Sequence, residues 1–339
     1  MKKATLKQIA EKLDISVSTV SRALSNKEGV GNSLKKEIIR EAKKIGYVFK
    51  IDEKNENSAN IFGVIVPNIQ NPFFLNFLKG IESVLFHRNY RFIMCNTDED
   101  VNKEKIYLKW LQENKVLGII AAPAFARDGS NNLSIYREIR KNIPIVLYDR
   151  EFHECDEFDS VCTDNKTAIC EAVEYLYKMG HRKIGILLSK RGNFCIEERL
   201  NGFLLTTKKL RMEVDENWIV DDLYPSFDIT GKFDKFFSST EKPTAVISTT
   251  HSISCNFLKN IRNKGLDVPK DISLIGYTDV IESDIFDPPL TTIKQPILEI
   301  GHIAATTTLA RIDDQYYEPS KVVLKTQLVE RNSVKKINI

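Results

Sequence analysis

Strand-length apolar runs alternate with helical patterns from residue 60 onward, and this alternation constrains the fold more than any other feature. The run "NIFGVIVPNI" is followed by the amphipathic stretch "NPFFLNFLKGIESVLFHRNY", and further strand–helix pairs follow up to "IPIVLYDR". After Val161 the same succession begins again and reaches "ISLIGYTD". Strands separated by helices form parallel sheets with helices on both faces. The pattern therefore predicts an α/β body of two lobes, each a doubly wound parallel sheet. A ligand would bind in the cleft between the lobes, at the carboxyl ends of the strands.

Ahead of this body lies a short stretch of a different kind, "TLKQIAEKLDISVSTVSRAL". Thr5 is suited to cap a first helix, whose Leu6, Ile9, Ala10 and Leu13 share one face, and Ser16 is suited to cap a second. We expect the inward stripe of that second helix to be Val17, Val20, Ala23 and Leu24. Ser18, Thr19, Ser21 and Arg22 would then face outward. A third helix is expected over about 34–45.

Three small helices with a tight turn between the first two form a helix-turn-helix module, whose second helix lies in the major groove of DNA. Residues 1–50 hold twelve Lys/Arg against five Asp/Glu, whereas the rest of the chain holds 37 against 41. A basic head on a mildly acidic body favours a polyanion-binding module. The alternative is an ordinary small helical bundle with solvated charges.

The head resembles that of the lactose-repressor/galactose-repressor (LacI/GalR) family in "TLKQIAEKLDISVSTVSRALSNKEGV" and "AKKIGY". The resemblance implies that Val17, Ser18 and Arg22 read bases. It further implies phosphate-contacting or capping roles for Thr5, Ser16, Thr19 and Ser21, and we expect Lys35 to lie near phosphates. The body is similar to the same family, and through it to periplasmic sugar-binding proteins, in "GVIVPNIQNPFF", "MGHRKIGIL", "GLDVPKDISLIGYTD", "PPLTTIKQP" and "LKTQLVERNS".

These features divide the chain into a headpiece over 1–49, a linker over 50–60 and a body over 61–339. The first lobe is expected at about 61–162 and 292–320, and the second at about 163–291 and 321–333. The linker is polar and lacks the Ala-Arg-x-Leu core of the family's hinge helix, whose Leu wedges into the minor groove. Our hypothesis is that minor-groove intercalation is weak or absent here, so that Ile51 does not wedge between base pairs.

The resemblance also places candidate effector-binding residues around the cleft. Asn71 and Phe73 match a loop of the first lobe, Asp149 a strand end, and Arg199 an arginine that grips the effector. Asp164 lies at a lobe crossover, and Phe125, Phe194 and Tyr277 offer stacking surfaces. Thr250-His251 and Thr278-Asp279 stand where the family usually has Asn-Asp and Asp-Asp, so His251 and Thr278 change the expected pocket. Gln295, within "TTIKQP", completes the set.

The sequence offers no pattern typical of an enzyme. It contains no GxSxG, HExxH or phosphate-cradling glycine-rich loop, and its five histidines are isolated. We therefore expect no catalytic residues, no metal and no cofactor. Six scattered cysteines, no apolar run of membrane-spanning length and no secretory signal favour a cytoplasmic protein.

The sequence thus predicts a DNA-binding transcriptional repressor, acting as a homodimer on a palindromic operator. Its DNA affinity would be controlled by a sugar or sugar-derived effector bound between the lobes. One alternative is a sugar-binding protein with weakened operator binding, and a second is an enzyme on the same scaffold. Regulation through a phosphoprotein partner also stays open.

Overall fold

The computed structural model describes residues 5–24, 30–45, 60–126, 128–153, 155–223, 232–233, 236–237, 241–312 and 318–338. The chain divides into two compact units, 1–59 and 60–339, which are described separately. The linker and its Ile51 lie outside the described residues. Among the described residues, none of the helices has the length and apolar character needed to span a membrane.

The first unit holds three helices, α1 (Leu6–Leu13), α2 (Val17–Leu24) and α3 (Asn32–Lys44). Their buried core comprises Ile9, Ala10, Val20, Ala23, Ile38 and Ala42. The predicted inward stripes are therefore confirmed, with one exception. Val17 is 45% exposed, so its assignment to the inward stripe of α2 was wrong. It is the first residue of the helix, and periodicity does not show how far along a stripe the neighbouring helices reach.

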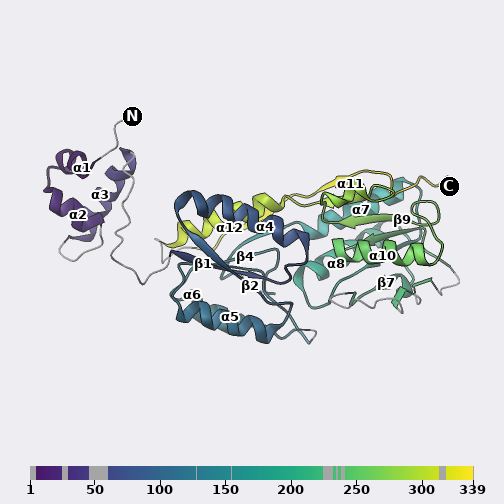
Figure 1. The fold of residues 1–339 in the computed structure, drawn as a ribbon. Helices are drawn as coiled ribbons and strands as arrows, with labels where there is room; N and C mark the ends of the chain where they lie inside the picture. Colours follow the sequence, from purple (N-terminus) through teal and green to yellow (C-terminus); the bar gives the residue numbers. More distant parts are fainter. Residues whose placement is uncertain are drawn as a thin grey trace. The chain divides into compact units, whose positions relative to one another are not determined.

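The first sheet of the second unit, of which Figure 1 labels β1, β2 and β4, has the strand order β11-β5-β4-β3-β1-β2. Its strands are β1 (Ile61–Val66), β2 (Arg91–Asn96), β3 (Ile119–Ala121), β4 (Ile145–Tyr148), β5 (Asp159–Thr163) and β11 (Lys321–Leu324). Its helices are α4 (Pro72–Leu85), α5 (Val101–Glu113), α6 (Leu133–Arg140) and α12 (Ile297–Ile312). Alternate residues of β1 face opposite sides, since Val64 packs in the core with α4 and α12 and Ile65 in the core with α5 and α6. This alternation places a helical layer on each face of the sheet.

The second sheet repeats that arrangement with the order β12-β10-β9-β8-β6-β7. Its strands are β6 (Ile184–Leu187), β7 (Ile219–Val220), β8 (Ala245–Ser248), β9 (Ser273–Tyr277), β10 (Thr291–Lys294) and β12 (Gln327–Val329). Helices α7 (Asn165–Lys178) and α8 (Phe194–Lys209) share one core with the sheet, and α10 (His251–Asn263) shares the other. A short helix, α11 (Glu282–Ile285), follows β9. The predicted pair of doubly wound lobes is thus confirmed.

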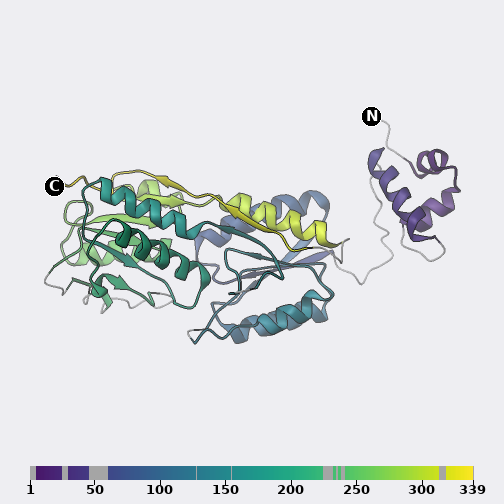
Figure 2. The same cartoon turned by 180° about the vertical axis from the view of Figure 1, so that it is seen from behind.

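The chain passes between the lobes three times, after β5, after β10 and after β11. Figure 2 shows the last passage as the yellow segment that runs beside α12 toward the C-terminus. The strand pairing moves two of the expected lobe limits. Thr291–Lys294 pairs with β9 and belongs to the second sheet, and Lys321–Leu324 pairs with β5 and belongs to the first. Each passage follows the end of a strand, and the sequence pattern does not show which sheet a strand beside a passage joins.

Candidate functional site

The first two helices of the head each begin at a side chain that caps them. Thr5 and Gln8 form a capping box on α1, in which the Gln8 amide donates to Thr5 Oγ1 at 3.4 Å and the Thr5 amide donates to Gln8 Oε1 at 2.9 Å. Ser16 Oγ accepts from the Thr19 amide at 3.0 Å and so caps α2. Both predicted caps are therefore present, and they fix where α1 and α2 begin.

Of the predicted base-reading residues, all three are exposed to solvent: Val17, Ser18 and Arg22. Ser18 and Arg22 are four residues apart and share one face of α2. Thr19, Ser21 and Lys35 are half-buried. The geometry leaves α2 open for a groove, while the DNA contacts themselves stay a prediction.

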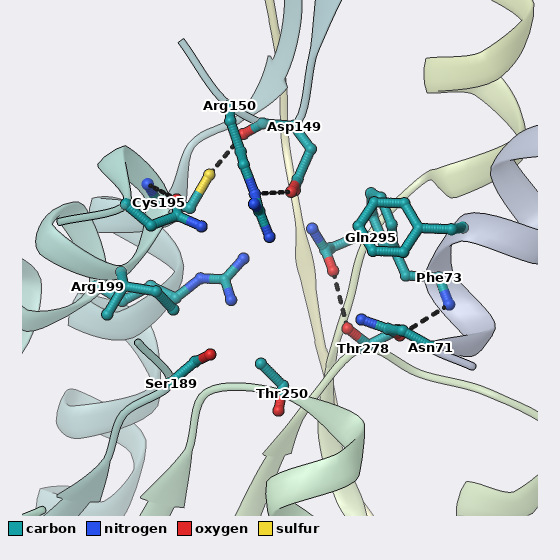
Figure 3. Close-up of a pocket in the computed structure, with 13 residues that line it drawn as sticks. Asn71, Phe73, Asp149, Arg150, Ser189, Cys195, Arg199, Thr250, Thr278 and Gln295 are labelled. Atoms are coloured by element: carbon teal, nitrogen blue, oxygen red, sulfur yellow. Dashed lines mark hydrogen bonds and ion pairs between the residues drawn. The ribbon is translucent and has the colours of Figure 1, made fainter. Parts of the chain in front are cut away.

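The body holds a pocket between its lobes, with an empty volume of about 420 Å³ that is partly open to solvent (Figure 3). It is lined by Asn71, Phe73, Phe74, Asp149, Arg150, Ser189, Asn193, Cys195, Ile196, Arg199, Thr250, Thr278 and Gln295. Asp149, Ser189, Thr250, Thr278 and Gln295 each follow the carboxyl end of a strand. The cleft therefore lies where the alternation of strands and helices places it.

The first-lobe wall is built around Arg150. Its Nη2 and Nη1 donate to Glu99 Oε1 and Oε2 at 2.6 and 2.7 Å, and its Nε lies 3.5 Å from Asp149 Oδ2. Burial disfavours the charged guanidinium, but Glu99 and Asp149 outweigh it and raise the pKa of Arg150 above its ordinary value. Asp149 has a φ of 60°, in the left-handed region that few residues other than glycine adopt. Its carboxylate is thus held at the pocket by a paired arginine.

The second-lobe wall is built around Arg199, which is 6% exposed. Its Nε donates to Asn165 Oδ1 at 2.9 Å, and its Nη1 donates to the Thr249 carbonyl at 2.6 Å. The guanidinium carbon lies 3.7 Å from the centroid of the Tyr277 ring, whose hydroxyl donates to the same Asn165 oxygen. Figure 3 shows the guanidinium directed into the pocket. These contacts hold the arginine in one orientation before any ligand binds.

Three further hydrogen bonds lie around the pocket, and two of them join the lobes. The Cys195 thiol of the second lobe donates to the Asp149 carbonyl of the first, and burial raises the pKa of this thiol well above its ordinary value. Thr278 Oγ1 donates to Gln295 Oε1 at 3.1 Å, and Gln295 Nε2 donates to Thr163 Oγ1 at 3.3 Å. The pocket floor is therefore tied to the strands at which the chain passes between the lobes.

Six of the predicted effector-binding residues line this pocket: Asn71, Phe73, Asp149, Arg199, Thr278 and Gln295. Five do not: Phe125, Asp164, Phe194, His251 and Tyr277. Phe125 packs in the first-lobe core, and Tyr277 supports Arg199 from behind. Asp164 caps α7 by accepting from the Thr167 amide at 2.9 Å.

The remaining two of those five lie in contacts of their own. Phe194 meets the His153 ring at 5.6 Å between centroids. The His251 ring stacks on Phe286, and its Nε2 lies 3.4 Å from Cys255 Sγ. Thr250, the residue before His251, is the one that lines the pocket.

Sequence reasoning missed seven lining residues: Phe74, Arg150, Ser189, Asn193, Cys195, Ile196 and Thr250. Two of them were open to prediction, because Asn193 and Thr250 have the residue types of helix N-caps and stand just before helical patterns. Arg150 directly follows Asp149, and Phe74 directly follows Phe73, so each could have been considered with its neighbour. Ser189, Cys195 and Ile196 carry no comparable signal.

Two family models match the chain. Residues 5–48 match "Bacterial regulatory proteins, lacI family", and residues 173–334 match "Periplasmic binding protein-like domain". The chain is 27% identical over 336 residues to the HTH-type transcriptional repressor PurR of Aliivibrio salmonicida, covering 98% of this chain and 100% of the relative.

Solved structures agree with these matches. A LacI family transcriptional regulator from Enterococcus faecalis V583 with bound ribose has a TM-score of 0.72 at 29% identity, covering 82% of this chain and 100% of that one. A regulator of the same family from Enterococcus faecium, also with bound ribose, has a TM-score of 0.69 at 26% identity, covering 82% and 100%. The chain therefore joins a lacI-family helix-turn-helix domain to a periplasmic-binding-protein-like domain, and its relatives include repressors.

Proposed function

We propose that the protein is a sequence-specific transcriptional repressor whose operator affinity is controlled by a small molecule bound between the lobes. The observation that carries the proposal is the capped helix α2, which leaves Val17, Ser18 and Arg22 open to solvent in a lacI-family domain. An arginine at this place is suited to bidentate contact with guanine. The relatives' printed names, which are those of repressors, support the same function.

The effector half of the proposal rests on the pocket. Phe73, Phe74 and Ile196 offer an apolar surface for a carbon skeleton, and polar side chains converge from both lobes around them. Two of the similar solved structures hold ribose, which supports a sugar or sugar-derived ligand. A ligand that touches both walls favours one angle between the lobes, and such coupling is typically worth about 1–3 kcal/mol.

The remaining parts of the proposal concern assembly and place. We infer a homodimer, because two heads reading two half-sites match a palindromic operator. We infer a cytoplasmic location, because operator DNA is the partner. That the protein is not an enzyme stays a prediction, which the non-enzymatic names of its relatives favour.

Selection from a randomised duplex pool by the full-length protein, at about 150 mM salt, tests the proposal. We expect an enriched palindrome. Arg22→Ala is expected to weaken the selected site by about 1–3 kcal/mol and to relax one base position in each half. The matched control, Arg88→Ala, removes an exposed arginine from the body and is expected to leave selection unchanged.

Three outcomes of this selection carry information. If folded protein enriches no sequence with or without candidate sugars, the repressor proposal fails and a sugar-binding protein is favoured. A side chain that wedges between base pairs favours one base step at the operator centre. A fixed CG step there would therefore contradict the hypothesis that the linker does not intercalate. A variable centre would support that hypothesis.

A further inference from the structure

The polar side chains of the pocket present donors, because helix capping uses their acceptors. Asn71 Oδ1 accepts from the Phe73 amide at 3.1 Å, and Asn193 Oδ1 accepts from the Cys195 amide at 3.0 Å. The side-chain NH₂ groups of both asparagines are thereby left as donors. The capping bonds also fix which amide atom is oxygen, since a backbone N–H requires an acceptor.

Two hydroxyls continue the pattern in the second-lobe wall. Thr250 Oγ1 accepts from the Ile253 amide at 3.3 Å, which leaves its O–H free to donate. Ser189 Oγ lines the pocket and has no hydrogen-bond partner among the described residues. Figure 3 shows Ser189 and Thr250 on the same side of the pocket as Arg199.

Arg199 adds a buried positive charge to this wall. Its three recorded contacts are with an amide oxygen, a backbone carbonyl and an aromatic ring, all of them neutral groups. Within the described parts of the chain, no carboxylate lies within ion-pair distance of it. A buried arginine without a counter-ion is costly unless a ligand supplies the negative charge.

Among the described residues that line the pocket, the one carboxylate belongs to the opposite wall. Asp149 lies beside Arg150, which also pairs with Glu99. Asp149, Glu99 and Arg150 together give that wall a net negative charge, although Asn71 also offers a donor there. The Arg199 wall is net positive, and Ser189, Asn193 and Thr250 add donors to it. The two walls therefore suit different ends of one ligand.

Helix N-termini reach the pocket from both lobes, one at the first-lobe wall (α4, with Asn71 as its N-cap) and two at the Arg199 wall. Helices α8 and α10, of 16 and 13 residues, both begin at the pocket, with Asn193 and Thr250 as their N-caps. The N-terminus of a helix favours negative charge through its dipole and its free N–H groups. Arg199, the free donors and two helix N-termini thus act in the same direction at one wall.

We propose, on the basis of the effector function inferred above, that the effector is an acidic sugar derivative. Its carboxylate or phosphate binds Arg199, Ser189 and Thr250, and its hydroxyls bind Asp149. A neutral sugar would leave the Arg199 charge and several donors without full partners. The charged group therefore supplies much of the binding and distinguishes the effector from the parent sugar.

The first test uses inorganic phosphate as the probe and the full-length protein. The unfolding temperature is followed while phosphate replaces chloride at constant ionic strength. We expect a saturable rise, because a ligand that binds only the folded state stabilises it by mass action. Arg199→Gln is expected to abolish the rise.

A matched pair of variants separates site binding from the general stabilising effect of phosphate on proteins. Ser189→Asp places a carboxylate at the proposed anion position, and Ser189→Asn places a neutral side chain of the same shape there. We expect the saturable rise to survive in Ser189→Asn and to vanish in Ser189→Asp. Equal responses from the two variants, or no saturable rise in the wild type, would overturn the proposal. This comparison holds even if Arg199→Gln does not fold.

The second test compares ribose and glucose with ribose 5-phosphate, glucose 6-phosphate, ribonate and gluconate by calorimetry. We expect at least one acid to bind about tenfold or more tightly than its parent sugar, and Ser189→Asp to remove that advantage. The phosphate and aldonate arms distinguish the two anionic groups. Tighter binding of a neutral sugar would contradict the inference and leave the repressor proposal intact. If the DNA selection fails while an acid still binds more tightly than its parent sugar, the repressor proposal fails and the inference about the ligand stands.

Discussion

The two lobes of the body share a topology but are held together by different polar chemistry. Strand for strand, the order β11-β5-β4-β3-β1-β2 corresponds to β12-β10-β9-β8-β6-β7. The outermost strand is parallel to its neighbour in the first lobe and antiparallel in the second. The buried carboxylates Asp159 and Glu104 carry polar contacts in the first lobe, and the buried Ser333 and His181 carry the contacts compared with them in the second. The hydrophobic pattern that sets topology thus repeats without repeating the polar residues within it.

The largest difference in stability that we expect between the lobes lies where each edge strand meets its sheet. In the first lobe Asp159, fully buried, accepts from Arg311 Nε and Nη2 at 3.0 and 2.9 Å and from the Ser320 amide at 2.9 Å. In the second lobe Ser333 Oγ donates to the Leu274 carbonyl and accepts from the Thr291 amide at 2.8 Å. One contact is a buried ion pair, and the other involves only neutral groups.

We expect Asp159→Ala to lower the free energy of unfolding by about 3–5 kcal/mol, because it removes the buried carboxylate that accepts from both Arg311 and Ser320. Ser333→Ala is expected to cost about 1–3 kcal/mol, the usual cost of an unsatisfied buried donor or acceptor. Urea unfolding of both variants measures the difference. Equal losses would show that the charge at the first edge contributes nothing beyond its hydrogen bonds.

The next difference is a pair of opposite pH dependences. Glu104 is buried in the first lobe and accepts from the Ala124 amide, Asn132 Nδ2 and Tyr136 Oη at 2.7 to 2.9 Å. Burial raises the pKa of Glu104 to about 7, against the effect of these donors. The folded state then holds a proton that the unfolded state has lost. Stability from this group is therefore complete below pH 4.5 and is lost as the pH rises to about 7.

His181 of the second lobe makes stability change with pH in the opposite direction. Its Nδ1 lies 2.8 Å from Thr244 Oγ1 and its Nε2 lies 3.0 Å from the Lys335 carbonyl oxygen. Burial lowers the pKa of His181 to about 4. Here the unfolded state binds the proton more readily, so the contribution is complete above pH 6.5 and is lost as the pH falls toward 4.

Urea titrations of wild type, Glu104→Gln and His181→Gln between pH 4.5 and 8 test this pair. Only the pH dependence of each difference is read, because both variants also lose hydrogen bonds that do not titrate. We expect wild type to lose about 3 kcal/mol relative to Glu104→Gln as the pH rises, and about 3 kcal/mol relative to His181→Gln as it falls. Parallel curves for wild type and a variant would show that the residue concerned does not titrate in this range.

The comparison of the two lobes also shows how much of the fold and of the pocket the sequence could predict. The alternation of apolar runs predicted both sheets, because buried parallel strands need continuous apolar residues. It did not assign the strands Lys321–Leu324 and Thr291–Lys294 to their sheets, since each lies beside a passage between the lobes and either sheet could accept it. Position along the chain also could not separate Thr250, which lines the pocket, from its neighbour His251, which does not.

Aromatic side chains were the least predictable part of the site. Phe125 and Tyr277 stand near strand ends, as pocket residues do, yet Phe125 is buried in the first-lobe core and Tyr277 is buried against Arg199. A sequence gives the position of such a residue but not the direction of its side chain at the end of a strand. Arg199 was predicted from the family motif, whereas the Asn165 and Tyr277 contacts that orient it required the fold.

The smallest difference in stability that we expect between the lobes concerns how closely their helices approach each other. In the first lobe a Cβ added to Gly301 of α12 would lie 2.3 Å from the Phe77 carbonyl oxygen of α4, and one added to Gly80 would lie 2.3 Å from the Leu298 carbonyl oxygen. In the second lobe a Cβ on Gly202 of α8 would lie 2.5 Å from the Lys166 carbonyl oxygen of α7. Backbone atoms cannot move aside as side chains can, so each alanine must separate two helices.

We expect Gly301→Ala and Gly202→Ala each to lower the free energy of unfolding by about 1–3 kcal/mol, a cost reduced by the better helix propensity of alanine. Gly301→Ala is expected to cost more, because Gly80 faces it and both helix backbones touch at that point. Thr306→Ala and Asn201→Ala, at exposed positions of α12 and α8, are the matched controls and should stay within about 0.5 kcal/mol of wild type. If both glycine variants matched their controls, the lobes would be able to open their helix pairs without loss. Close backbone contact would then not be what fixes α4 against α12 and α7 against α8.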